Sequence, residues 1–197
     1  MHKCVLLFLY SKLFYSKNNI KMKECVSMLE RLDKNEFERL YALMDESFPP
    51  AEIRDFKGQQ MLLDKPDYNV YVLRENGEIL AFFAEWVNKK YRFVEHLAVN
   101  EKYRSQGLGS KTLQAYNALS SKPVILEVEP PEDEIQRRRI KFYERNGFHL
   151  SSYSYIQPVI NEGHEQVPLV LMTYPELLDN DTLAEVKNWL DQTVYKS

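Results

Sequence analysis

The sequence of 197 residues has little cysteine, little glycine and no long apolar run. Its two cysteines, Cys4 and Cys25, both lie near the amino terminus, which excludes a disulfide framework and a Cys/His metal cluster. We therefore expect a reduced, cytoplasmic setting and no metal. The apolar run at residues 4–10 is much shorter than the ~20 residues that a membrane span needs, so no membrane segment is expected. With only six glycines, collagen-like and low-complexity chains are also excluded.

The composition is that of an ordinary folded domain. Apolar residues make up 44% of the chain and charged residues 28%, and the length suits one domain. The net charge of −3 is unevenly spread, because residues 1–27 carry five lysines and only one glutamate. The rest of the chain is therefore strongly acidic. An acidic body argues against nucleic acid as a partner and favours a cationic one.

The basic stretch at residues 1–27 is predicted to be an extension of the domain. Its apolar core is short for a targeting signal, and no small-residue cleavage pattern follows it. The stretch would be dispensable, or would lie upstream of a true start at Met22 or Met28. The expected organisation is an extension at 1–27, one domain at 28–174, and a helix at 175–197 that packs on the same domain.

Apolar periodicity and turn residues predict one mixed domain of the α/β (α+β) class, with hairpins early and an α/β crossover in the middle. Asn76-Gly77 is a strong two-residue hairpin turn, and Asp181 is expected to cap the last helix. The expected strands are 25–32, 70–74, 79–87, 91–99, 124–128, 151–160 and 167–174, and the expected helices are 34–48, 53–63, 108–119, 135–146 and one that begins after Asp181.

One segment carries a chemical pattern, a strand that runs into a loop with two glycines one residue apart. Gly107 and Gly109 lack a Cβ, so a ligand can approach the main chain closely there. A helix is expected to begin at Leu108, and the first amides of a helix lack internal partners and lie at its positive end. Arg104 adds a positive charge. The pattern indicates a diphosphate site, although it matches neither a P-loop nor a dinucleotide fingerprint and could also be a turn that binds nothing.

A second motif in register makes this pattern more specific. The segment 104–109 is followed by Phe142-Tyr143-Glu144-Arg145-Asn146-Gly147-Phe148, and together the two resemble the GCN5-related N-acetyltransferase (GNAT) superfamily. The resemblance covers about three quarters of the chain. It implies a mixed, mostly antiparallel sheet of about seven strands with helices on both faces, here with an added C-terminal helix. It also implies that acetyl-CoA donates its acetyl group directly to an amine, without an acyl-enzyme.

The resemblance also implies where coenzyme A is held. In family members a pair of neighbouring strands, here 91–99 and 124–128, separates to admit the thioester. Gln136 stands where relatives often carry an asparagine that contacts the cofactor. The arginine run at 137–139 could reach the phosphates, but a solvated helix face is the expected reading. The pyrophosphate would be held by the main chain of Arg104, Ser105, Gln106, Gly107, Leu108, Gly109 and Ser110, and the pantetheine arm by the strand edge at Leu97, Ala98 and Val99.

Tyr143 stands where many family members keep a tyrosine that protonates the departing thiolate. A phenol with a pKa of about 10 stays protonated near pH 7 and can donate to a thiolate of similar basicity. The alternative is that Phe142, Tyr143 and Phe148 are core aromatics that close a helix. The sequence leaves both roles open.

Three glutamates are candidates for binding or deprotonating an amine. Glu95 lies where several relatives place a general base or its water relay, and strand alternation puts it on one face with Leu97 and Val99 and puts His96 on the other. The alternative for Glu95 is an ion pair with a structural lysine or arginine. Glu127 and Glu129 alternate at the end of the next strand, where they could bind a cationic acceptor or share the base role, unless the strand frays there. These two lie at a carboxyl end, where such sheets bind ligands.

The leading expectation is an acetyl-CoA-dependent N-acetyltransferase that acts on a primary amine of a small molecule. Two other functions remain open: a non-catalytic protein that binds or senses acyl-CoA, and a protein or peptide N-acetyltransferase. The last helix lies outside the family pattern and could cap the sheet edge or contribute to a homodimer. The loops that select the acceptor carry no readable code.

Overall fold

The computed structural model describes residues 29–160 and 166–196. The predicted extension at 1–27 and the first half of the predicted strand at 25–32 lie outside these ranges.

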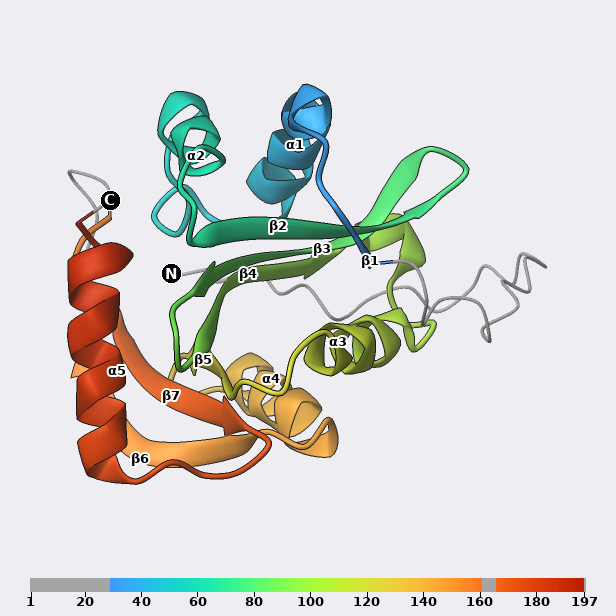
Figure 1. The fold of residues 1–197 in the computed structure, drawn as a ribbon. Helices are drawn as coiled ribbons and strands as arrows, with labels where there is room; N and C mark the ends of the chain where they lie inside the picture. The colour runs from blue at the N-terminus through green and yellow to red at the C-terminus, as the bar shows by residue number, and fades with distance from the viewer. Residues whose placement is uncertain (1–28, 161–165, 197) are drawn as a thin grey trace.

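A single seven-stranded sheet forms the centre of the molecule (Figure 1). Only β4 and β5 run parallel to each other, and every other neighbouring pair is antiparallel. The expected mixed, mostly antiparallel sheet is therefore confirmed. In spatial order the strands are β1 (Leu29–Arg31), β2 (Tyr68–Glu75), β3 (Glu78–Val87), β4 (Arg92–Val99), β5 (Val124–Val128), β7 (Pro168–Tyr174) and β6 (His149–Ile156).

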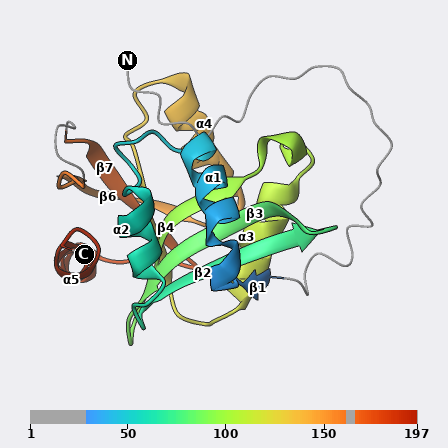
Figure 2. The same ribbon diagram turned by 90° about the horizontal axis from the view of Figure 1, so that it is seen from above.

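Helices cover both faces of the sheet, as expected (Figures 1 and 2). The first face carries α1 (Phe37–Ser47), which follows a short 3-10 turn, and α2 (Phe56–Leu62). The opposite face carries α3 (Leu108–Ala118) and α4 (Glu134–Arg145). Each pair of helices buries its apolar side in a separate cluster of buried residues, so the sheet is sandwiched between two cores.

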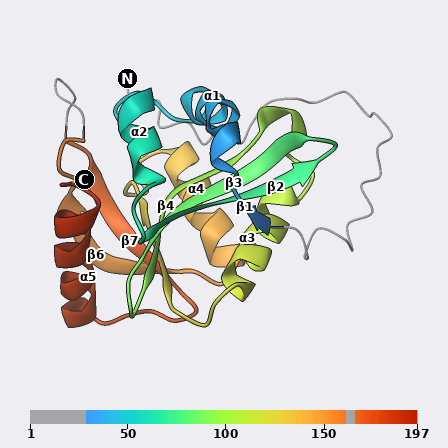
Figure 3. The ribbon, with the colours of Figure 1, turned by 45° about the horizontal axis from the view of Figure 1, so that its top comes forward.

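The last helix, α5 (Asn180–Thr193), runs beside β6 and β7 at the end of the sheet (Figure 3). Leu183, Val186 and Leu190 are each 0% exposed and join the same core as α1 and α2. The apolar side of α5 is thus buried within its own chain. Asp179, and not Asp181, caps this helix, because its side chain accepts a hydrogen bond from the amide of Thr182. Both aspartates precede the apolar positions, and only the backbone path decides between them.

A β-bulge in β4 changes which side chains share a face. Ala84 of β3 pairs with His96, but Glu85 pairs with Val94, so the intervening Glu95 has no partner of its own. Nδ1 of His96 lies 3.9 Å from Oε2 of Glu95 on the side of α1 and α2, whereas Leu97 packs in the opposite core. The predictions that Glu95 shares a face with Leu97 and Val99, and that His96 points away from it, are wrong because the extra residue shifts the two-residue alternation.

Within the ranges that the structure describes, every helix is too short or too polar to cross a bilayer.

Candidate active site

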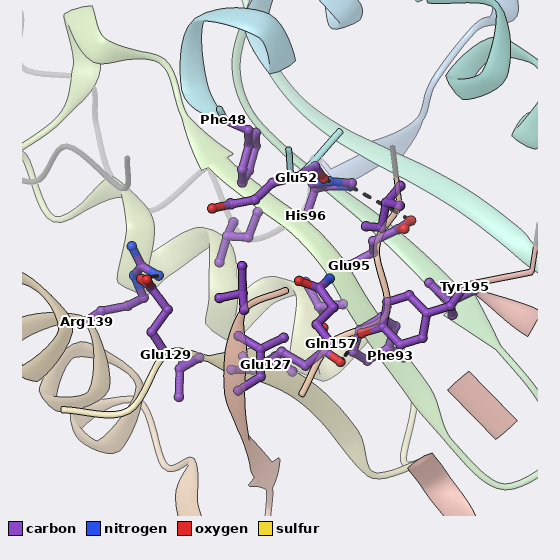
Figure 4. A pocket seen from close by; sticks show the side chains of 18 of the residues that line it. Phe48, Glu52, Phe93, Glu95, His96, Glu127, Glu129, Arg139, Gln157 and Tyr195 are labelled. Atoms are coloured by element: carbon purple, nitrogen blue, oxygen red, sulfur yellow. Dashed lines mark hydrogen bonds and ion pairs between the residues drawn. The ribbon is translucent and has the colours of Figure 1, made fainter. Parts of the chain in front are cut away.

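β4 and β5 begin as a parallel pair and then diverge. Their register holds for three residue pairs, the last of which joins Val94 to Leu126. Beyond this point a cavity of about 100 Å³ opens between the two strands, lined by Glu95, Glu127 and Glu129 among others (Figure 4). The expected separation of these strands is therefore present. The backbone edge of β4 from Leu97 to Val99 has no β5 partner in the register.

Glu95 lines the cavity as one half of a buried ion pair. Nη1 of Arg54 lies 2.8 Å from Oε1 of Glu95, and the indole nitrogen of Trp86 donates to Oε2 over 2.8 Å. Burial raises the pKa of Glu95, but the charge and hydrogen bond of Arg54 outweigh it, so the pKa lies below its ordinary value. The carboxylate stays ionised at neutral pH, with a protein donor on each oxygen.

Arg54 connects Glu95 to the end of the chain. It follows α1 in sequence, is 7% exposed, and its Nη2 donates to the carbonyl of Val194 over 2.6 Å. Val194 is the C-cap of α5 and also lines the cavity. The last helix therefore helps to position the guanidinium that holds Glu95.

Glu127 is the second carboxylate of the cavity, and its partners are uncharged. The hydroxyls of Tyr155 and Tyr195 both donate to its Oε1. Burial raises its pKa to about 8, although the hydrogen bond from Tyr195 lowers the pKa. A carboxyl group with such a pKa can exchange a proton near neutral pH.

Glu129 follows β5 directly and pairs with Arg139 of α4, with 3.2 Å between Oε2 and Nη1. Both side chains are largely buried, and both line the cavity (Figure 4). The strand end therefore does not fray into solvent. The expectation of a solvated face for the run 137–139 is wrong for Arg139, which Glu129 draws inward, but it is correct for the exposed Arg137 and Arg138.

Tyr143 is a core aromatic that also reaches the wall of the cavity. It is 5% exposed, and its ring makes edge contacts with Phe142 and Phe148, as a core aromatic would. It also lines the cavity from the side of α4. Its packing fixes the ring at the wall of the cavity, where the phenol could act on a ligand.

The loop before α3 exposes backbone at Gly107, whereas Gly109 is a buried residue of the helix itself, so the expected exposure at both glycines is wrong for Gly109. Ser105 and Gly107 have φ angles of 65° and 74°, in the left-handed region. Gly107 is the N-cap of α3 and has no side chain with which to cap the first amides. Arg104 folds back and donates from Nε to the carbonyl of Val99 over 2.9 Å. Ser110 accepts a hydrogen bond from Asn146, which ties this helix start to the end of α4.

Gln136 has a structural role at the start of α4. Its Oε1 accepts hydrogen bonds from the amides of Glu132 and Asp133, and it completes a capping box with Asp133. It is not among the residues that line the cavity.

Several residues of the site carried no signal in the sequence. Arg54 lies in a loop, Trp86 near the end of β3, and Tyr195 just after the last helix, and none belongs to a motif. Arg54 and Trp86 reach Glu95, and Tyr195 lines the cavity, because the sheet brings β3 and β4 together and α5 packs against them. The one clue in the sequence was the apolar spacing of α5, which predicts that its end lies against the core.

The comparisons with known proteins agree with this architecture. A family model described as "Acetyltransferase (GNAT) domain" matches residues 66–150. The "Putative acetyltransferase YjbC" of Bacillus subtilis is 33% identical over 118 residues, which cover 58% of this chain. The match spans 59% of the length of that curated relative.

Solved structures extend the likeness to most of the chain. One from Bacteroides thetaiotaomicron, a "Putative acetyltransferase from GNAT family", has a TM-score of 0.80 and 28% identity, and the match covers 86% of this chain and 98% of the other. Arabidopsis thaliana NAA60 in complex with acetyl-CoA has a TM-score of 0.58 and 15% identity, with 74% and 96% covered, a likeness of fold alone. Together these matches support membership of the GNAT acetyltransferase superfamily, a family that uses acetyl-CoA.

Proposed function

We propose that this protein is an N-acetyltransferase that moves an acetyl group from acetyl-CoA to a primary amine of a small molecule. The observation that carries the proposal is the cavity between the diverging strands, with carboxylates on its walls and exposed backbone nearby at the start of α3. Such a cavity suits a slender cation next to a thioester. Because the carboxylates attract an ammonium group, the acceptor would enter as its protonated form.

The cofactor side of the proposal rests on the backbone before α3. A Cβ built on Gly107 meets no atom within 4 Å, so the loop has open space on that side for a ligand. The main chain from Arg104 to Ser110 would hold the pyrophosphate, and the edge from Leu97 to Val99, which has no β5 partner, would hold the pantetheine arm. Acetyl-CoA supplies an activated acetyl group, and the chain has only to orient it. Because Oε1 of Gln136 accepts hydrogen bonds within the capping box, its amide nitrogen is the group that could contact the cofactor.

The acceptor side rests on the acidic wall of the cavity. Glu95 and Glu129 each share their charge with an arginine, so we assign them to contact and orient the ammonium group of the acceptor. Tyr143, on the α4 side of the cavity, would donate its phenolic proton to the departing thiolate. The amine nitrogen attacks the acetyl carbon directly, so no side chain becomes acylated.

We expect Gly107→Val to weaken coenzyme A binding at least about tenfold, because a β-branched residue disfavours the left-handed backbone that exposes the amides. Isothermal titration calorimetry with coenzyme A measures the effect. Gly77→Val is the matched control, since Gly77 has a φ of 79° and equally open surroundings but lies in the β2–β3 turn. Both variants should lose similar stability, and only the first should lose affinity. Equal affinities in the two variants would contradict the assignment of this loop.

The function is tested by incubating the full chain with acetyl-CoA and a panel of primary alkylamines, diamines and amino-acid amides while free thiol is measured. Amine-dependent thiol release with formation of the acetylated amine is the expected result. Coenzyme A binding without release on any amine would favour a non-catalytic acyl-CoA-binding protein. Turnover only with a peptide amino terminus would favour the protein acetyltransferase.

A further inference from the structure

The three carboxylates of the cavity differ in how they are neutralised. Glu95 and Glu129 each form an ion pair with a buried arginine. Glu127 has no such pair among the described residues, and its two hydrogen-bond donors are the phenols of Tyr155 and Tyr195. A carboxylate held by an arginine is a weak base, whereas one held by neutral donors in a buried site keeps its affinity for a proton. Glu127 is thus the carboxylate best suited to accept one.

The two phenols leave one oxygen of Glu127 accessible to a proton. Both donate to the same oxygen, Oε1, and Glu127 itself lines the cavity (Figure 4). No hydrogen bond to Oε2 is found among the described residues, so this oxygen can receive a proton. Tyr195 cannot take that proton itself, because burial raises its pKa far above its ordinary value and its phenol stays protonated. Tyr195 therefore acts as a donor throughout.

The phenols come from different regions of the chain and are themselves held in place. Tyr155 lies on β6, and Tyr195 follows α5. The ammonium of Lys187, on α5, lies 4.7 Å from the centre of the Tyr155 ring and 5.8 Å from that of Tyr195. It is paired with Asp191 at 2.5 Å, so it orients the rings without neutralising Glu127 directly. The groups that face Glu127 are therefore Tyr155, Tyr195, Glu95, Lys187 and Asp191.

We propose that Glu127 is the catalytic proton acceptor for the attacking amine, and that Tyr155 and Tyr195 are positioning residues that hold its Oε1. This inference rests on the proposed function. An ammonium nitrogen loses two protons on becoming an acetamide, and the departing sulfur gains one. Glu127 Oε2 takes the first proton and passes it to solvent, which frees the lone pair that forms the C–N bond. When the C–S bond breaks, Tyr143 gives its proton to sulfur, and the second proton from nitrogen returns to the Tyr143 phenolate.

The assignment predicts a specific pH profile. Wild-type kcat/KM should rise with pH to a plateau above about pH 8, since Glu127 must be ionised to act and burial raises its pKa to about 8. Glu127→Gln should lower kcat/KM by about 100-fold and remove this rise. Tyr195→Phe and Tyr155→Phe each remove one donor to the ionised form, so the rise should move to higher pH by roughly half a unit or more.

The matched control is Tyr153→Phe. Tyr153 lies on β6 two residues before Tyr155, is partly buried like it, and does not line the cavity. The pH profile of the Tyr153→Phe variant should equal that of wild type. A purely structural role for Tyr195 would lower activity without moving the profile.

If Glu127→Gln keeps the wild-type rise while wild type is active, the assignment is wrong and the proposed function stands. If wild type releases no thiol with any amine, the proposed function fails and this inference with it. Should Glu127→Gln fail to fold, the profiles of the two phenylalanine variants decide.

Discussion

Tyr143→Phe is expected to lower kcat by about 10²–10⁴-fold, the usual contribution of a positioned general acid. The hydroxyl is lost, so the departing thiolate must be protonated by water. The ring itself remains, with its edge contacts to Phe142 and Phe148 at 5.2 and 5.6 Å between centroids. The melting temperature and the KM for acetyl-CoA should therefore change little. Steady-state thiol release between pH 7 and 9, together with thermal melts, measures both quantities.

Tyr174→Phe is the matched control, because it removes a phenol from the same core but not from the cavity. Tyr174 packs on Phe148, 5.3 Å away between ring centroids, and is not a cavity residue. This variant should keep wild-type turnover. If Tyr143→Phe also keeps it across that pH range, then Tyr143 is a core aromatic only.

Arg54→Met is expected to destabilise the fold by about 3–5 kcal/mol at pH 7, because it leaves the buried Glu95 without its cation. Both side chains of the pair are less than a tenth exposed, so solvent cannot replace the guanidinium. The hydrogen bond to the carbonyl of Val194 is lost as well, which loosens the end of α5. Urea unfolding of wild type and variant measures the difference in the free energy of unfolding.

The loss should depend on pH in a defined direction. In wild type the pKa of Glu95 is lowered below 4.5, so its pairing stabilises the fold above that pH and is lost as the pH falls through the folded-state pKa. Without Arg54, burial raises the pKa instead, and the penalty disappears once Glu95 is protonated. The difference between the two proteins should therefore shrink from pH 7 to pH 4.

Two further variants test the cause of this loss. Arg54→Met combined with Glu95→Gln should recover some of the stability, because no unpaired charge remains buried. Arg138→Met breaks an exposed pair with Glu134 on α4 and should cost at most about 0.5 kcal/mol. Equal losses for Arg54→Met and Arg138→Met would show that burial of the pair has no energetic consequence.

Local chemistry made much of the fold predictable. Asn76-Gly77 forms the expected hairpin turn, with positive φ at both residues. The strand predicted at 124–128 has the same bounds in the structure, and the helix after Gly107 begins at Leu108. Turn residues, short apolar runs and glycines act over a few positions, so neighbouring residues in the sequence are enough to reveal them.

The sequence by itself determined the resemblance to the family, the order of the elements and the glycine turn before α3, because each depends on residues that are close together in the chain. Only the tertiary structure decided which side chains pair with each carboxylate of the cavity. The bulge at Glu95 moved that side chain to the face of Arg54, and the packing of α5 brought Tyr195 to Glu127 from 68 positions away. Proton affinity in a buried site is set by such distant partners, and no local pattern encodes them.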